Sequence, residues 1–197
     1  MFGRFVASAL VTMFGLSTFT ASAKDPQTIG ELHPPVEASM GEQEITVFFL
    51  KNNLKNQVTE VHVPYAEIFY APANTAKPTL NYVWKVESEQ IASVFFFERK
   101  SPGKVGKSMY VLMKSKESTS GFEGVAYWTM ELPLIKRGDQ LSLAFFSGDP
   151  PDPVLQYCRD GRDLENETDV VCPYKDAASI KKRLASLDEK AVEGHKP

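Results

Sequence analysis

The chain has 197 residues and a formal net charge of −3 at pH 7, and hydrophobic side chains make up 43% of it. This length and composition suit one domain with its own hydrophobic core. So mild an acidity argues against general nucleic-acid binding, which requires clustered basic residues. The two cysteines and three histidines are scattered, so we expect no metal site and no cofactor.

Residues 1–23 are predicted to be a secretory signal peptide. Arg4 precedes an apolar run from Phe5 to about Phe19, and small residues precede a cleavage site after Ala23. An uncleaved membrane anchor is the alternative. No later stretch approaches the roughly 18 apolar residues of a membrane-spanning helix. The sequence therefore predicts a periplasmic or secreted protein with no stable membrane insertion.

Residues 24–43 are polar and rich in proline, which predicts an irregular N-terminal segment. From residue 44 onward, short segments rich in β-branched and aromatic residues alternate with turn-forming clusters, as is typical of β-strands. The predicted strands lie at 44–50, 58–63, 66–71, 80–86, 91–98, 108–114, 122–132 and 140–146, with a short ninth strand at 154–157.

Eight or nine strands without intervening helices predict a mainly β protein, an antiparallel β-sandwich of Ig-like or jelly-roll type over residues 44–175. Alternation with a period of two supports several strands, and it places four residues of one strand on the same face. These residues are Leu80, Tyr82, Trp84 and Val86.

One C-terminal α-helix is predicted at 176–191, followed by a tail at 192–197. Asp176 is a candidate N-cap, and apolar residues recur behind it at helical spacing. The stripe consists of Ile180, Leu184, Leu187 and Ala191. We expect the helix to dock this stripe on the sandwich, and a free helix that recruits a partner is the alternative.

Cys158 and Cys172 are expected to form a disulfide, because exported proteins meet an oxidising environment. In the chain-entropy model, closing a loop of about 15 residues contributes about 3 kcal/mol of stability. The alternative is two free thiols that serve metal or redox chemistry. The chain has no Cys-x-x-Cys pair and no histidine near the two cysteines, so this alternative lacks support.

The loop between the cysteines carries five acidic residues: Asp160, Asp163, Glu165, Glu167 and Asp169. It does not match an EF-hand calcium loop, because Gly161 follows Asp160 directly and Arg162 stands where a ligand is needed. The loop is therefore either a stapled surface loop or a constrained element that binds a partner.

The segment 101–108 ends like a phosphate-binding loop, but Ser101 stands where that motif needs a glycine. What remains is a basic hairpin around Lys104. Its lysines either guard strand edges against aggregation or contact an acidic partner.

No catalytic motif is apparent. His33, His62 and His195 are far apart in the chain, and no Gly-x-Ser-x-Gly elbow occurs. Asp149 and Asp152 lie among prolines and form a candidate carboxylate pair of the kind that glycosidases use. We therefore assign no catalytic residue and expect a protein that is not an enzyme.

Adjacent phenylalanines recur within predicted strands, at 48–49, 95–97 and 145–146. Neighbouring residues on a strand face opposite ways, so at least one ring of each group points away from the main core. Either another segment covers these rings, or they form an exposed aromatic patch that is typical of an interaction surface.

These features favour a protein-recognition domain of the cell envelope, such as an inhibitor or immunity protein or an accessory factor of a secretion or surface assembly. Its partner would be an envelope or secreted protein, and its oligomeric state is open. A small-ligand or lipid carrier that uses the sandwich interior is a second hypothesis, and a carboxylate-dependent hydrolase is a third. The candidate partner-binding residues are Asp160, Asp163, Glu165, Phe96, Phe97 and Lys104.

Overall fold

The computed structural model describes residues 31–55, 62–73, 75–88, 90–101, 104, 106–146 and 152–193. Within these ranges, it describes only the backbone at residue 31, at residues 52–55 and 62–64, and at residue 193. Several predictions fall outside this part of the chain: the signal peptide, Asp149, His195 and most of the tail.

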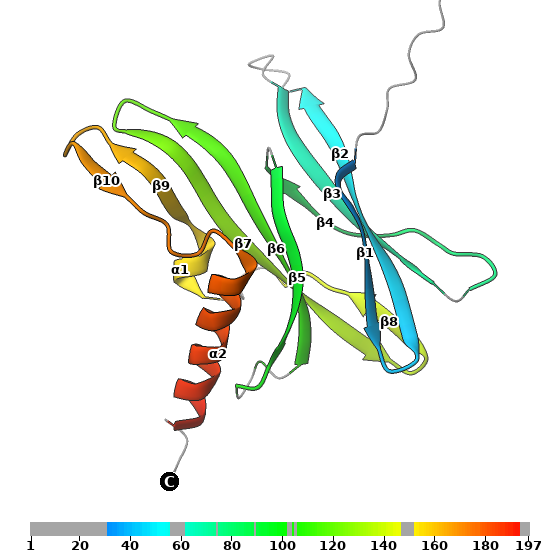
Figure 1. Ribbon diagram of the computed structural model, residues 1–197. Coiled ribbons are helices and arrows are strands. Elements are labelled where there is room, and N and C mark those ends of the chain that lie inside the picture. Colours follow the sequence, from blue (N-terminus) through cyan, green and yellow to red (C-terminus); the bar gives the residue numbers. More distant parts are fainter. Residues whose placement is uncertain are drawn as a thin grey trace, which may run out of the picture.

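Two antiparallel sheets face each other, and a helix covers the outer face of the second sheet (Figure 1). The first sheet contains, in spatial order, β1 (Glu31–Met40), β2 (Gln43–Lys55), β3 (His62–Pro72) and β4 (Asn81–Glu87). The prediction of a mainly β protein with antiparallel sheets and a C-terminal helix is confirmed.

The second sheet has the order β10-β9-β7-β6-β5, and β8 pairs with the far end of β7. Its strands are β5 (Gln90–Arg99), β6 (Gly106–Ser118), β7 (Phe122–Arg137), β8 (Gln140–Leu143), β9 (Cys158–Asp163) and β10 (Thr168–Val170). Most neighbouring strands are also neighbours in the chain. The Ig-like or jelly-roll assignment, which implies Greek-key connections, therefore stays a prediction.

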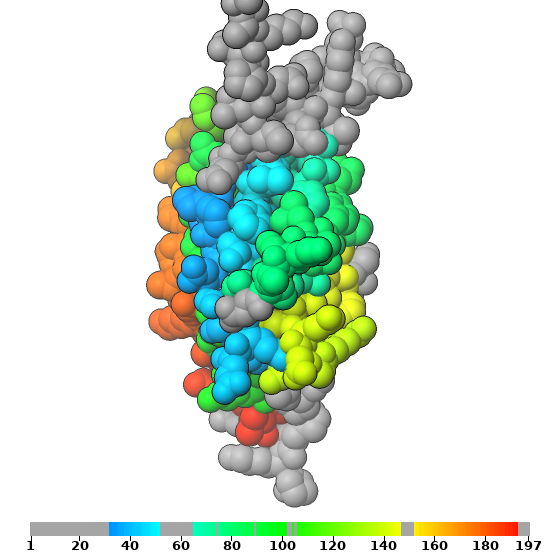
Figure 2. All heavy atoms as spheres, turned by 90° about the vertical axis from the view of Figure 1, so that its right-hand side faces the viewer, coloured from blue at the N-terminus to red at the C-terminus, as the bar shows by residue number. Residues whose placement is uncertain are grey.

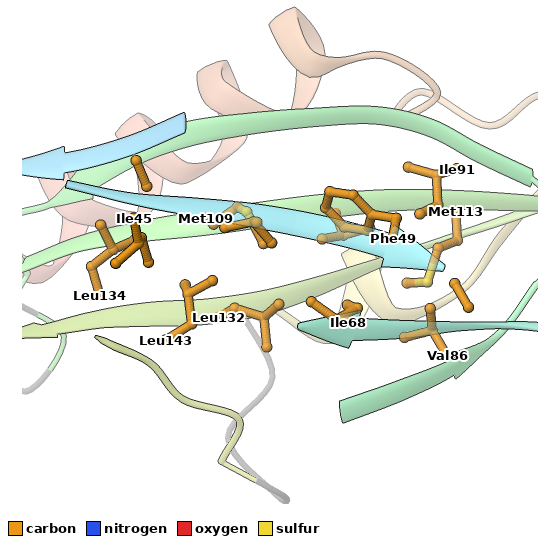
Figure 3. Packing of buried hydrophobic residues seen from close by; sticks show 14 of the residues in the cluster. Ile45, Phe49, Ile68, Val86, Ile91, Met109, Met113, Leu132, Leu134 and Leu143 are labelled. Atoms are coloured by element: carbon orange, nitrogen blue, oxygen red, sulfur yellow. The ribbon is translucent and has the colours of Figure 1, made fainter. Parts of the chain in front are cut away.

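The hydrophobic core fills the space between the two sheets (Figure 3). Ile45, Phe49 and Ile68 reach in from the first sheet, and Met109 and Leu132 meet them from the second, all with at most 1% of their surface exposed. Removing such side chains from water is the main favourable term in folding. Because side chains occupy this space, the interior gives the ligand-carrier hypothesis no support.

The C-terminal helix α2 (Ala177–Glu193) forms where a helix was predicted and packs on the outer face of the second sheet. Ile180 and Leu184 are fully buried against Phe95 and Tyr110 of the sheet. Asp176 precedes the helix, and its Oδ1 accepts the backbone N–H of Ser179 at 2.8 Å, which is the geometry of an N-cap. The predicted docking of the apolar stripe thus covers the outward rings of β5.

The prediction of an irregular segment at 24–43 is wrong for its second half, because β1 spans Glu31–Met40. Pro34 and Pro35 concealed the strand in the sequence. Proline is tolerated in an edge strand, and β1 is the edge of its sheet, where the register shifts around the two prolines.

The predicted strand at 154–157 is instead the short helix α1 (Pro153–Gln156). Asp152 caps this helix by accepting the backbone N–H of Val154 at 2.9 Å, and Pro153 occupies the first turn, where its missing N–H costs nothing. An apolar run this short does not distinguish a strand from a helix.

The prediction that one face of β4 carries Leu80, Tyr82, Trp84 and Val86 is also wrong. Leu80 precedes the strand, and Val83 is an extra residue: Trp84 pairs with Ile68 while Tyr82 pairs with the adjacent Phe69. Because of this extra residue, the side chains after the bulge lie on the opposite face of the sheet from the one that simple alternation predicts. Val86 and Trp84 therefore face the second sheet, and Tyr82 lies on the opposite face.

Candidate functional site

β4 ends the first sheet, and among the described residues it pairs only with β3. Its other side is therefore a strand edge to which the described part of the chain adds no further strand. β8 likewise pairs with one strand only, β7, and it has four residues. Three other edges differ from that of β4. β1 carries two prolines, β10 has only three residues, and β5 lies against β1 of the facing sheet.

Aromatic side chains flank this edge on both faces. Trp84 is 39% exposed and stacks on Phe145 with ring centroids 4.4 Å apart. Phe146, which follows Phe145 in the sequence, is 52% exposed. On the outer face, Tyr82 is 52% exposed and meets Phe69 edge-on at 5.6 Å. We call these five residues the β4 aromatic patch. Exposed aromatic clusters of this kind are typical of protein interaction surfaces.

Figure 2 views the outer face of the first sheet, where β1 and β2, β3 and β4, and the segment around β8 lie side by side. β8 contacts β2 and β3 although it pairs with β7. The chain that leaves β8 therefore delivers Phe145 to the end of the first sheet. The sequence marked the 145–146 pair as a candidate outward group, but it gave no sign that Trp84 would be its neighbour.

A groove of about 1050 Å³ opens at the end of the first sheet where β4 begins. Its walls are the β1–β2 turn, the β3–β4 loop from Thr75 to Asn81, and the β7–β8 hairpin from Lys136 to Ser142. Gln43 Nε2 donates to Gly138 O at 3.0 Å and ties two of these walls together. Asn81 Nδ2 donates to Thr79 O at 2.9 Å, and this hydrogen bond stabilises the third wall, the β3–β4 loop.

The predicted disulfide between Cys158 and Cys172 is confirmed, with the two Cα atoms 5.4 Å apart. It closes an ordered β-hairpin, since β9 and β10 pair between the cysteines. Two glycines, Gly124 and Gly161, face each other where β9 joins β7. A disulfide is compatible with export to an oxidising compartment.

Replacing both cysteines by serine is expected to lower the free energy of unfolding by about 3 kcal/mol, because the crosslink restricts the unfolded chain. Urea denaturation followed by circular dichroism measures this change. Reduced wild-type protein should match the double variant. Equal midpoints for the oxidised protein and the double variant would contradict the prediction.

Two acidic residues of the hairpin, Asp160 and Asp163, accept hydrogen bonds from nearby residues. Asp160 accepts two hydrogen bonds from Lys175 Nζ, the shorter at 2.9 Å, and these bonds hold the pKa of its carboxyl below the usual value. Asp163 accepts from the side chain and backbone of Asn166 and from the backbone of Glu165, which likewise lowers its pKa. These two carboxylates therefore organise the hairpin and its turn.

The other candidate residues lie at different places in the fold. Phe96 packs toward the core between the sheets, and Phe97 packs toward the helix on the opposite face of β5. Lys104 Nζ lies 3.8 Å from Glu131 Oε2. Phe96, Phe97 and Lys104 thus do not form one surface with the hairpin acids Asp160, Asp163 and Glu165.

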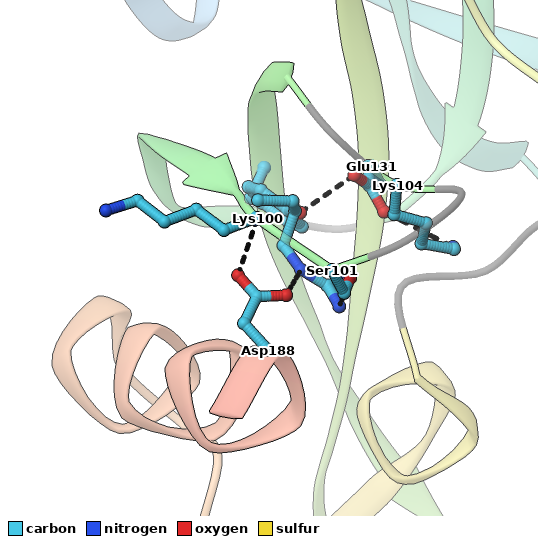
Figure 4. A network of polar contacts seen from close by, with 7 residues as sticks. Lys100, Ser101, Lys104, Glu131 and Asp188 are labelled. Carbon is cyan, nitrogen blue, oxygen red and sulfur yellow. Dashed lines mark hydrogen bonds and ion pairs between the residues drawn. The ribbon is translucent and has the colours of Figure 1, made fainter. Parts of the chain in front are cut away.

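A buried polar network joins α2 to the second sheet (Figure 4). Arg99 Nε donates to Asp188 Oδ1 at 2.8 Å, and Arg99 Nη2 donates to Ser101. Nearby, Tyr110 donates to Glu131 Oε1 at 2.8 Å. Burial, together with the adjacent carboxylate, raises the pKa of Tyr110 well above its usual value, so the phenol stays protonated. No local sequence pattern indicates these pairs, because their partners are up to 89 positions apart.

The residues considered for catalysis are placed as follows. Asp152 is buried, caps α1 and accepts two hydrogen bonds from Arg183, the shorter at 2.8 Å. His33 packs edge-on against Phe49 at 5.4 Å. Across the described ranges, no three His, Cys, Asp or Glu side chains gather in a way able to hold a metal ion. None of the helices described there is long and apolar enough to cross a membrane.

Comparisons of the chain with protein-family models, with curated proteins and with solved structures found no match.

Proposed function

We propose that this protein is an exported recognition domain that binds an extended segment of another envelope or secreted protein along the free edge of β4. The observation that carries the proposal is the combination of an unpaired strand edge with exposed aromatic side chains on both of its faces. An added strand gains main-chain hydrogen bonds from such an edge, and its side chains find contacts on alternate faces.

The Val83 bulge determines which face of the sheet carries each aromatic ring. Because of the bulge, Tyr82 lies on the outer face of the sheet and Trp84 on the inner face. A strand beside β4 has side chains that alternate between the same two faces. Neighbouring side chains of the bound segment would therefore each meet an aromatic ring, so an extended segment with consecutive apolar residues fits the site.

Natural proteins protect exposed edges with charged side chains, especially lysine. The exposed charges of β4 are Lys85 and Glu87 in its second half, and the exposed side chains before them are Tyr82 and Trp84. The aromatic part of the edge carries no charged residue, which suits a protein that binds extended segments. Both roles considered from the sequence, an inhibitor and an assembly factor, are compatible with this mode of binding.

The test is capture of a partner from envelope extract on the immobilised, oxidised protein, followed by affinity measurements with the purified partner. Tyr82→Lys is expected to weaken binding about 30-fold, because losing an aromatic anchor costs about 2 kcal/mol or more. Trp84→Lys is a second variant on the other face. Thermal unfolding verifies that both variants stay folded.

Val171→Lys is the matched control, because Val171 is 70% exposed on the disulfide hairpin. It should leave the affinity unchanged. The opposite pattern, in which Val171→Lys abolishes binding and both β4 variants bind normally, would move the recognition site to the hairpin and refute the proposal.

A further inference from the structure

The second half of β4 carries two opposite charges on one face of the sheet. Val86 is 3% exposed and faces the second sheet, so Lys85 and Glu87 on either side of it point outward. Both side chains are exposed, and neither forms an ion pair with a described residue. On β3, Glu67 lies opposite Lys85, and Tyr65 lies opposite Glu87. The free side of β4 therefore offers both charges to an added strand.

The charges determine which antiparallel strand fits this side. Antiparallel pairs outnumber parallel pairs about two- to three-fold, and every strand pair in the described part of this protein is antiparallel. Opposite charges directly across a strand pair stabilise it, and like charges destabilise it. A fitting strand passes Glu87 first and Lys85 second. Read from its N-terminus, it carries a base, an apolar residue and an acid.

β4 itself has this order, as Lys85-Val86-Glu87. Two copies of β4 that pair about a two-fold axis through Val86 place Lys85 of each copy opposite Glu87 of the other. An axis through Lys85 would oppose two lysines, and an axis through Glu87 would oppose two glutamates. An axis through Trp84 would bring the Val83 bulge of both copies into the ladder. The charges and the bulge thus select the register centred on Val86.

From this complementarity we propose that the protein forms a homodimer in which β4 pairs antiparallel with β4 of a second copy. The contact uses the same surface of both copies and closes with two of them. It supplies main-chain hydrogen bonds to two free edges and two pairs between Lys85 and Glu87. The paired stretch covers only residues 84–88 of each copy, so the dimer is weak and reversible. It covers the edge to which the proposed function assigns the partner, so the partner must displace the second copy.

Sedimentation velocity of the oxidised mature protein, from micromolar concentrations to about 1 mM, measures the dimer dissociation constant. Lys85→Glu turns both attractive pairs into repulsive ones and is expected to raise this constant at least about tenfold. Glu87→Lys should do the same. An equimolar mixture of the two variants opposes two acids of one chain to two bases of the other. The mixture should therefore dimerise like the wild type.

The mixture also separates dimerisation from folding, because it contains the same two chains that fail to pair alone. Lys77→Glu is the matched control, since it makes the same charge change at an exposed position of the β3–β4 loop, outside the paired stretch. It should leave the dissociation constant unchanged.

Three results would each refute the dimer: a wild-type protein that stays monomeric at about 1 mM, single variants that dimerise like the wild type, or a mixture that stays monomeric. These results leave the proposed function standing, because that function depends on partner capture and on Tyr82→Lys. If Tyr82→Lys instead leaves partner binding unchanged while the mixture dimerises, the proposed function is refuted and the dimer stands.

Discussion

Replacing Asp188 by alanine is expected to lower the free energy of unfolding by about 3–5 kcal/mol, because it leaves a buried guanidinium without its counter-charge. Arg99 is 4% exposed, and its Nε lies 2.8 Å from Asp188 Oδ1. The second carboxylate oxygen accepts the backbone N–H of Lys100 at 2.8 Å. The variant would therefore orphan both a charge and a backbone donor at the junction of α2 with the second sheet.

Urea denaturation followed by circular dichroism measures the change, and two further variants sharpen the result. Glu189→Ala removes a carboxylate from the exposed neighbouring position and should shift stability by no more than about 0.5 kcal/mol. The pair Arg99→Met with Asp188→Leu removes both charges and should cost less than Asp188→Ala alone. A double variant less stable than the single one would contradict the buried-charge explanation.

The contribution of Asp188 should also depend on pH. Burial tends to raise the pKa of this carboxyl, but the hydrogen bonds from Arg99 and Lys100 outweigh burial and hold the pKa below the ordinary value of 3.8. A carboxyl whose pKa is lower in the folded state stabilises the protein above its unfolded pKa, and that stabilisation is lost as pH falls through the folded pKa. The stability difference between wild type and Asp188→Asn should therefore shrink below pH 3.8.

Gly161→Ala is expected to cost about 3 kcal/mol, at the upper end of what overpacking costs, because the added methyl group has no room. A Cβ at this position would lie 2.6 Å from Gly124 Cα and against the backbone oxygen of Glu123. The ring of Phe122, which is almost fully buried, already covers the glycine pair, and its Cζ lies 3.0 Å from the same point. Backbone on one side and a packed ring on the other prevent easy relaxation.

Gly121→Ala is the matched control, because Gly121 also lies against the disulfide hairpin. Its Cβ would also be crowded, at 2.9 Å, but the neighbouring atom is the end of the flexible Glu165 side chain, which can move. We expect a change below about 1 kcal/mol. Thermal unfolding of the three proteins under identical oxidising conditions measures the difference. Equal losses for both variants would show that the backbone contact at Gly161 is not the cause.

The parts of the fold that the sequence predicted well are those with a strong local signal. β6 carries an apolar run over residues 109–113, β7 is rich in β-branched and aromatic residues, and α2 has a regular apolar stripe behind its N-cap. β9 was missed because its sequence, Cys-Arg-Asp-Gly-Arg-Asp, has almost no apolar side chains. It forms because β7 offers it a partner, and the disulfide holds its end to the chain after β10.

The candidate site depends on neighbours that no local pattern encodes. β4 is an edge strand because of the order of the strands in the sheet, and Tyr82 lies on the outer face because of the Val83 bulge. The sequence pointed to outward phenylalanines in general, which proved useful for Phe145 and Phe146. It pointed equally to Phe96 and Phe97, whose partly buried rings pack toward the two hydrophobic clusters. The facing sheet covers Phe96 and α2 covers Phe97, and no local pattern indicates either contact.

The two prolines of β1 bear on how this protein behaves at high concentration. β4 and β1 are opposite edges of the same sheet, so joining the β4 edge of one molecule to the β1 edge of the next would repeat without closing. Such head-to-tail contacts generate fibres. Pro34 and Pro35 have no N–H to offer, and the register shifts beside them break the regular ladder that a growing fibre needs. The prolines of β1 thus oppose polymerisation through the proposed binding edge at β4.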